Sequence, residues 1–369
     1  MKIIKKFLFI IAFLSISVAA EDIQPITVET LFGPLEITDP LIIELIHSPA
    51  MQRAKEIDQS GASRYYREEI PPFSRYYHSL GVYYLLARFN LPREEQVAGL
   101  LHDASHTVFS HTGEFLFNHF SHEDSYQDSI HAWSLEKQGI GDNLTKYNLK
   151  LDDIVYKDKS FPGLEQHLPD ICADRIEYNL NTGVLLGLIT NQDVLDILND
   201  LHFDGENWYF GNPLMAKKLA LLPLYFTEHF WGANWNWVLS HYFSESLRRA
   251  VELDLISYHD IHFSTDAEIL AILENSHDEV IQDYLKLCEE HNDIFSFTTT
   301  EIDNYDYFNT PKFRGFDPLI KINGSFKRLR ELDEDFAAKY ERTKEESLRG
   351  FYITIKRQLF LIYHQLEKK

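Results

Sequence analysis

Apolar residues recur every three to four positions over most of this chain, which is the spacing of one face of an α-helix. Gly61 and the pair Pro71-Pro72 interrupt this pattern and separate the first helical stretches. The spacing predicts helices over residues 40–60, 75–89, 91 to beyond 111, 168–180, 216–226, 235–255, 266–273 and 278–291.

Two regions instead alternate apolar and polar residues, which is typical of β-strands. ITVETLFGPLEIT, residues 26–38, turns at Phe32-Gly33-Pro34 and predicts a short hairpin. Residues 296–330 hold short β-like pieces such as LIKIN, and residues 331–348 predict a charged, solvated helix. We therefore expect a mainly α fold: a helical core, a short N-terminal hairpin and a small C-terminal α/β annex.

A length of 369 residues favours one domain with appendages, or two domains. The expected divisions are a signal peptide at 1–20, a helical core at 21–200, a helical extension packing on the core at 201–295, and the annex at 296–369.

The first twenty residues have the pattern of a secretory signal peptide. Three lysines precede an apolar run from Phe7 to about Ser17, and small residues follow at 18–20. A membrane-spanning helix needs about 20 apolar residues, and the acidic pair Glu21-Asp22 comes before that length is reached. We expect export to a periplasm or the medium, with no stable membrane anchor after the signal is removed.

The charge balance excludes one broad class of partner. The chain has 35 Lys and Arg against 57 Asp and Glu, a formal net charge of −22. Such a protein is repelled by the phosphates of long DNA or RNA, so binding of a nucleic acid polymer is not expected.

The two cysteines, Cys172 and Cys288, lack the spacing of a zinc ribbon. Cys172 is expected to be a buried thiol, although export would permit a disulfide with Cys288.

The histidines are concentrated in one part of the chain. Six of the 17 lie within residues 78–122, and adjacent His102 and Asp103 directly follow the apolar run VAGLL. Imidazole nitrogens and carboxylate oxygens are ligands that Mn, Fe, Co, Ni and Zn accept. Neighbouring helix residues point about 100° apart, so a shared ion needs further ligands from distant segments, and His78 and Asp174 are the candidates.

Two further expectations concern single histidines. His106 follows His102 by four residues, which would place both on one helical face and His106 near the ion without making it a ligand. His119 and His262 are isolated among aromatic residues and are expected to be ordinary structural histidines.

The ordered motifs resemble those of the HD superfamily of metal-dependent phosphohydrolases. More narrowly, they resemble the branch of deoxynucleoside triphosphate triphosphohydrolases, which includes bacterial enzymes and the animal enzyme with SAM and HD domains. The similarity covers residues 39–182. The matching segments are RYYHSLGV at 75–82, HDASHTVFSHTGE at 102–114, FSHEDS at 120–125, ADRIEY at 173–178 and, upstream, SPAMQRAKEIDQSG at 48–61.

The resemblance implies a role for each matching residue. It implies that a divalent ion, which could be Mn, Fe, Co, Ni, Zn or Mg, is bound by His78, His102, Asp103 and Asp174. It implies a polar catalytic group made of His106, His111, Glu114 and His122. It implies that Arg75 meets phosphate oxygens, Arg175 the phosphate tail, and Gln59 and Tyr178 the sugar or base.

The chain also departs from the pattern of that branch. Ser105 stands where the branch often has glycine, and Asn181-Thr182 replaces an Arg-Asp pair that helps to place the nucleotide. His47 stands where the animal enzyme carries an acid of its regulatory site.

The expected function is that of an exported metal-dependent phosphohydrolase acting on a small phosphorylated substrate. A (d)NTP triphosphohydrolase-like reaction by a metal-activated water is favoured, with His111 or His122 as acid or base and Glu114 orienting the imidazole. One alternative is a nucleotide monophosphatase or phosphodiesterase on the same site. Another is a non-enzymatic exported binding protein, an alternative suggested by the aromatic patch FWGANWNW at residues 230–237. Relatives in this branch commonly assemble, so a homo-oligomer is also considered.

Overall fold

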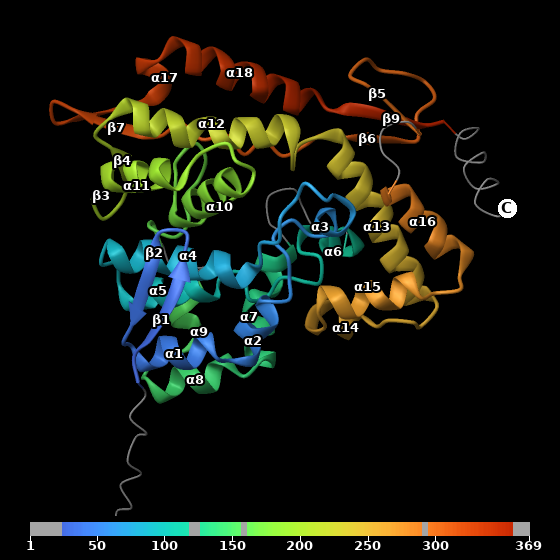
Figure 1. Cartoon of the computed structure of the whole chain (residues 1–369), viewed down its shortest axis with the longest axis horizontal. Coiled ribbons are helices and arrows are strands. Elements are labelled where there is room, and N and C mark those ends of the chain that lie inside the picture. The colour runs from blue at the N-terminus through green and yellow to red at the C-terminus, as the bar shows by residue number, and fades with distance from the viewer. Residues whose placement is uncertain (1–23, 118–125, 156–160, 290–293, 357–369) are drawn as a thin grey trace, which may run out of the picture.

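The computed structural model describes residues 24–117, 126–155, 161–289 and 294–356. The predicted signal peptide, His119 and His122 lie outside these ranges. Within them the chain forms eighteen α-helices and nine strands (Figure 1), and about 55% of it is helical. This confirms the expectation of a mainly α fold with added strands.

The predicted N-terminal hairpin is present. Strands β1 (Ile26–Thr30) and β2 (Gly33–Ile37) pair antiparallel, with Thr30 opposite Gly33. Gly33 adopts a φ of +107°, a conformation that residues with a Cβ rarely accept.

Helices follow the hairpin as far as residue 200. They are α1 (Pro40–Ile46), α2 (Pro49–Ala54), α3 (Ser63–Tyr66), α4 (Arg75–Arg88), α5 (Arg93–Leu101), α6 (His111–Glu114), the 3-10 turn η1 (Phe115–Phe117), α7 (Tyr126–Lys137), α8 (Ile140–Lys146), α9 (Leu151–Ile154), α10 (Ala173–Leu185) and α11 (Asn191–Asp200). The single helix expected over residues 40–60 is divided, because Ser48 caps a new helix and Pro49 opens it.

The helix expected to run past His111 also ends early. Helix α5 stops at Leu101, with His102 at its C-cap. Phe109 and Ser110 then adopt φ values of +57° and +51°, and the hydroxyl of Thr107 donates to the carbonyl of Ser110 at 3.2 Å. Small polar residues bond to nearby backbone in this way and compete with helix formation. His102 and His106 therefore do not share a helical face, and the path of the loop sets their spacing.

The C-terminal half adds helices and two small sheets. Its helices are α12 (Pro213–His229), α13 (Asn234–Glu252), α14 (Tyr258–Phe263), α15 (Asp266–Glu274), α16 (Glu279–Glu289), α17 (Leu329–Leu332) and α18 (Glu334–Arg349). Its strands are β3 (Leu201–Phe203), β4 (Trp208–Phe210), β5 (Phe295–Thr298), β6 (Tyr307–Asn309), β7 (Leu319–Ile322), β8 (Ser325–Arg328) and β9 (Phe351–Ile355). The sheet orders are β3-β4-β7-β8 and β5-β9-β6.

Strand pairing joins the segments on either side of residue 295. Strand β4 runs parallel to β7, with Phe210 opposite Ile320, and β5 pairs antiparallel with β9. Helices α12 and α18 lie side by side along one edge of the molecule in Figure 1, and they also make direct contact. Where the chain divides into domains stays a prediction.

The buried apolar side chains form two clusters. The larger contains the hairpin, α1, α4, α5, α10 and α12, and residues of α17 and α18 join it. The second lies among α13, α15 and α16, with Val108 and Phe109 from the loop after α5. That loop therefore connects a helix end in the first cluster to side chains buried in the second.

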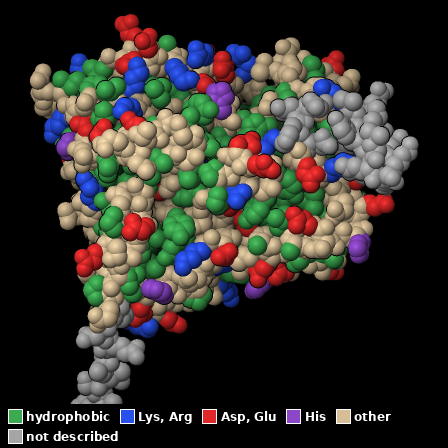
Figure 2. Space-filling model, viewed as in Figure 1, with side chains coloured by type: hydrophobic (Ala, Val, Ile, Leu, Met, Phe, Trp, Pro, Cys, Tyr) green, Lys and Arg blue, Asp and Glu red, His purple; other side chains and the backbone are tan. Residues whose placement is uncertain are grey.

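The surface charges and the two cysteines can be compared with what the sequence led us to expect. On the face drawn in Figure 2, acidic and basic side chains are interspersed. Cys172 and Cys288 are both buried free thiols, so the alternative of a disulfide between them is not found. Among the described residues, no helix combines the length and apolarity needed to span a membrane.

Candidate metal centre and active site

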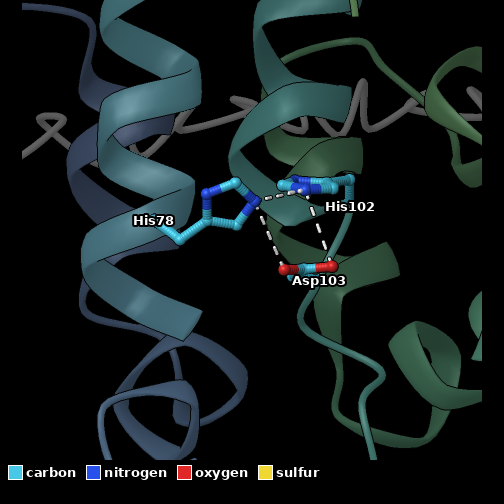
Figure 3. Close-up of side chains that lie close together, drawn as sticks. All are labelled: His78, His102 and Asp103. Carbon is cyan, nitrogen blue, oxygen red and sulfur yellow. Dashed lines mark hydrogen bonds and ion pairs between the residues drawn. The ribbon is translucent and has the colours of Figure 1, made fainter. Parts of the chain in front are cut away.

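The four predicted metal ligands converge from three helices. His78 projects from α4, His102 and Asp103 stand at the end of α5, and Asp174 lies in the first turn of α10. The Nε2 atom of His78 is 3.2 Å from Nε2 of His102 and 3.0 Å from Oδ1 of Asp174. The two carboxylate oxygens of Asp103 divide between them: Oδ2 lies 3.5 Å from Nε2 of His78, and Oδ1 lies 3.5 Å from Nε2 of His102 (Figure 3).

A glycine allows α4 and α10 to approach closely enough for this convergence. A Cβ at Gly81 would lie 2.5 Å from Oε1 of Glu177, inside any normal contact distance. Glu177 is fully buried on α10 and hydrogen-bonds Nδ1 of His78. The glycine of RYYHSLGV therefore makes room for the carboxylate that orients His78, a predicted metal ligand.

The protonation of the two imidazoles fits a bound cation. Nδ1 of His102 lies 2.8 Å from the carbonyl oxygen of Gly99, which only accepts, so the proton of His102 is on Nδ1. The carboxylate of Glu177 assigns the same tautomer to His78. In the neutral imidazoles, both Nε2 atoms then carry the lone pairs with which they would bind a metal ion. Two nitrogen and two carboxylate donors of this kind suit a divalent transition metal.

The local charge favours a cation as well. Burial alone lowers the pKa of His78, but Glu177, Asp174 and Asp103 outweigh it and raise the pKa to about 10. Burial would raise the pKa of Asp103, and the charge of Arg75 with the neighbouring imidazoles holds it well below its usual value. Carboxylates thus surround the two imidazoles, and a divalent ion would balance the negative charge of these carboxylates.

Arg75 supports the centre from the side of α4. It is 3% exposed, and its Nη1 donates to Asp103 Oδ2 at 2.7 Å while Nε donates to Ser110 Oγ at 2.9 Å. The Ser110 hydroxyl in turn donates to the carbonyl of Asp58 at 2.6 Å. Arg75 therefore orients the predicted metal ligand Asp103, and its expected contact with phosphate oxygens stays a prediction.

Three of the four predicted catalytic residues lie beside the metal ligands. Nε2 of His106 is 3.2 Å from Asp103 Oδ1, and its ring centre is 5.0 Å from that of His111. Helix α6 places His111 and Glu114 three residues apart on one side, with His111 Nδ1 3.2 Å from Glu114 Oε2. His122, the fourth, lies outside the described residues.

The protonation states within this group differ. Burial, together with the charge of Arg75, lowers the pKa of His106 to about 4, so this imidazole is neutral near pH 7. Burial would raise the pKa of Glu114, but His111 outweighs it and lowers the pKa to about 2. Nδ1 of His106 and Oε1 of Glu114 are buried and make no hydrogen bond within the described residues, but they lie 3.5 Å from each other. His106 therefore lies between Asp103 on one side and Glu114 on the other.

The residues predicted to bind the substrate differ in the neighbours that they contact. The ring centre of Tyr178 lies 6.3 Å from that of His78 and 5.7 Å from that of Trp231 in the aromatic patch. Arg175 donates to Glu165 at 2.7 Å and to the carbonyl of Asp170 at 2.9 Å, so a carboxylate already balances its charge.

Gln59 lies in the turn that packs on the loop after α5. A Cβ at neighbouring Gly61 would be 2.4 Å from the carbonyl oxygen of Phe109, and Gly61 has a φ of +59°. The backbone N–H of Gln59 donates to Phe73 at 2.7 Å, and its buried Oε1 makes no hydrogen bond within the described residues. The roles of Gln59, Arg175 and Tyr178 toward a substrate stay predictions.

Sequence reasoning missed the side chains that support the ligands. Glu177 was recognised only as part of ADRIEY, although an acid in a buried position of an apolar helix is a signal of such a role. His131 and Gln127 on α7 were not singled out. Gln127 donates to the carbonyl of His102 at 2.6 Å, and both side chains bond the hydroxyl of Ser105. Ser105, a departure from the family pattern, thus ties the loop to α7.

Comparisons with known proteins agree with this geometry. Residues 75–135 match the HD domain family. The chain is 30% identical over 322 residues to the uncharacterised protein YdhJ of Bacillus subtilis, a match that covers 87% of this chain and 96% of YdhJ. It is 30% identical over 194 residues to the metal-dependent phosphohydrolase cns2 of Cordyceps militaris, and this match covers 53% of each protein.

Two crystal structures share the fold. A phosphohydrolase from Bacteroides thetaiotaomicron superposes with a TM-score of 0.66 at 16% identity, covering 90% of this chain and 99% of its own. A hypothetical protein from Aquifex aeolicus superposes with a TM-score of 0.65 at 16% identity, covering 91% of this chain and 98% of its own.

Proposed function

This chain belongs to the HD-domain superfamily of metal-dependent phosphohydrolases, and on that premise we propose that its substrate is a nucleotide, with a (d)NTP hydrolysed to nucleoside and triphosphate as the favoured reaction. The observation that carries the proposal is the position of His106, His111 and Glu114 directly beside the two-histidine, two-aspartate ligand set. Acid-base groups next to a metal site are what hydrolysis of a phosphate ester or anhydride requires.

In the proposed reaction, the site residues have three separate roles: metal binding, charge balance and proton transfer. A bound divalent ion would polarise a phosphoryl oxygen and lower the pKa of an attacking water. His78, His102, Asp103 and Asp174 would hold the ion, and Arg75 balances the charge of Asp103. Glu114 accepts from Nδ1 of His111, which leaves Nε2 of this half-exposed imidazole free to take a proton from water or to protonate the leaving oxygen.

Substitution of the ligands tests the enzyme. His102→Ala and Asp103→Ala are each expected to lose bound metal and to lower nucleotide turnover by roughly a thousandfold or more, because the Lewis acid is worth several kcal/mol. Elemental analysis and a nucleotide screen with added Mn, Co, Ni and Mg measure both effects. His259→Ala, an exposed histidine of α14, is the matched control and should keep metal and turnover. Wild-type turnover retained by both ligand variants would contradict this mechanism.

The released product separates the favoured reaction from its alternative. Asn181-Thr182 stands in place of the Arg-Asp pair that helps to place the nucleotide in related enzymes, and Asn181 donates to Glu177 at 2.9 Å. This departure keeps a nucleotide monophosphatase or phosphodiesterase as the second candidate. Release of triphosphate supports the first proposal, while release of inorganic phosphate, or cleavage of a cyclic nucleotide, supports the second.

We also propose that the enzyme is exported. The support is the pattern of residues 1–20. Expression with the native N-terminus should yield a protein outside the cytoplasm that begins at Glu21, as read by intact mass. A full-length chain retained inside the cell would contradict export and would leave the catalytic proposal unaffected.

A further inference from the structure

The loop that follows α5 receives hydrogen bonds from a side chain of α7 and from the residue after that helix. Helix α5 ends at Leu101, so the backbone carbonyls just beyond it have no partner in a further helical turn. Nε2 of Gln127 donates to the carbonyl of His102 at 2.6 Å, and Nε2 of Gln138 donates to that of Ala104 at 3.3 Å. Two glutamine amides therefore take the place of the missing turn beside the predicted metal ligands.

The amide of Gln127 holds this loop at two points. Its Nε2 carries two hydrogens, and besides the carbonyl of His102 it donates to Oγ of Ser105 at 2.8 Å. Gln127 and Ser105 are buried, with 5% and 2% of their surface exposed. Asp103 lies between the two points of contact. One buried side chain therefore fixes the backbone on both sides of a predicted metal ligand.

The hydroxyl of Ser105 donates to His131, a second buried residue of α7. Ser105 Oγ lies 2.7 Å from Nδ1 of His131 and already accepts from Gln127, so its own proton points to the imidazole. Burial, followed by the charge of His102, lowers the pKa of His131 to about 4, and a neutral imidazole can accept at Nδ1. The hydrogen bonds therefore run in one direction, from Gln127 to Ser105 and from Ser105 to His131.

The buried face of α7 is polar. Gln127, His131 and Ser134 recur at spacings of four and three, which places them on one side of the helix, and Leu135 is the one apolar residue buried on it. A helix that serves only to pack buries an apolar stripe, because a buried polar group costs free energy unless it is hydrogen-bonded. Here the polar groups are bonded to the loop or, at Ser134, to Gln138. This face is therefore suited to orienting the loop.

We propose that Gln127 and His131, acting through the carbonyl of His102 and the hydroxyl of Ser105, are positioning residues that direct His102 and Asp103 toward the metal ion. None of the four hydrogen-bonding groups involved is itself a metal ligand. They set the backbone from which both ligands project, and metal sites depend on such supporting contacts. This inference rests on the metal site of the proposed function and is independent of the substrate.

The test is metal affinity in variants that differ in hydrogen bonding but not in size. Gln127→Met removes both donors, and its affinity for Co²⁺, measured by titration with a chelator, should fall by about ten- to a hundredfold. The visible absorption of the Co²⁺-loaded protein, which reports ligand geometry, should change as well. His131→Asn keeps an acceptor near the position of Nδ1 and should stay within about threefold of the unsubstituted protein, whereas His131→Leu should lose about tenfold.

Matched measurements separate positioning from folding. Lys137→Gln changes an exposed residue of α7 and should leave the affinity and the spectrum unchanged. The difference between His131→Asn and His131→Leu, each a folded protein by circular dichroism, isolates the hydrogen bond from the packing of the ring. Unchanged affinity and spectrum in Gln127→Met, or equal losses in the two His131 variants, would overturn this inference alone. An unsubstituted protein that binds no metal would overturn both the inference and the proposed function.

Discussion

In His78 and His102, the hydrogen bond at Nδ1 decides whether Nε2 is available to bind a metal ion. His78 and His102 direct Nε2 to the metal site because Nδ1 is bonded to Glu177 in one case and to the carbonyl of Gly99 in the other. The identities of these histidines could be read from the sequence, since a His-Asp pair after an apolar run is unusual. Glu177 could not be assigned in the same way, because its role depends on the approach of α10 to α4.

Replacing Glu177 tests this dependence. Glu177→Gln keeps the size of the side chain but removes the charge that fixes the tautomer of His78 and raises its basicity. Metal affinity should fall by about ten- to a hundredfold, as is usual for such supporting residues. Titration with a chelator, followed by elemental analysis, measures the change. Glu274→Gln, at an exposed position of α15, should bind metal normally, and equal affinity in the two variants would exclude the assigned role.

At the scale of elements, α15 holds the loop that carries His106, one of the predicted catalytic residues. Asp266, its first residue, accepts from the backbone N–H of Phe109 at 2.6 Å and from that of Asp58 at 2.9 Å. Arg53 adds a bond to the carbonyl of His106 at 2.9 Å. The helix itself was predicted from its spacing. Its contact with a loop more than 150 residues away follows from packing between the two apolar clusters, which no local pattern encodes.

The pH dependence of stability should reveal this buried carboxyl group. Burial raises the pKa of Asp266 from 3.8 to about 7. Between these values the folded state keeps a proton that the unfolded state releases, so the contribution of this group is full below pH 4 and is lost as the pH rises through 7. Asp266→Asn does not titrate. Its free energy of unfolding relative to the unsubstituted protein should therefore rise from pH 4 to pH 8, by on the order of 2–4 kcal/mol.

Urea unfolding of both proteins across this pH range measures the difference. A difference that stays constant with pH would contradict the raised pKa of Asp266.

Some elements escaped prediction although their signals were present. Helix α11 begins at a capping box in which Thr190 and Asp193 bond each other's backbone, a recognisable start signal. Strands β3 and β4 lie within residues 201–210, where the sequence pattern predicted no strand. Strands of three residues carry too little periodicity to be recognised, and pairing with β7 stabilises them.

At the scale of the whole molecule, the C-terminal residues are integrated with the rest. Strand β7 continues the sheet begun by β4, and Phe336 and Tyr340 of α18 are buried in the larger cluster. Lys339 of α18 also pairs with Glu228 of α12 at 2.9 Å.

Truncation tests this integration. A chain ending at residue 295 would expose the apolar face of α12 and the edge of β4, and we expect it to be insoluble or to aggregate. A chain ending at Lys356 keeps β9 and should remain soluble and bind metal. The soluble fraction and the sedimentation profile measure both. A soluble, monomeric and metal-binding product from the shorter chain would show that residues 296–369 are a separable annex.

The sequence by itself determined the mainly α class, the hairpin and the candidates for the metal site, because helix spacing, turn residues and donor chemistry are local properties. Only the tertiary structure decided that α5 stops at Leu101, that Glu177 orients His78, and that Arg75 and Arg175 are paired with Asp103 and Glu165. These features depend on which distant side chains meet. Packing of the two apolar clusters brings those side chains together, and no spacing along the chain records it.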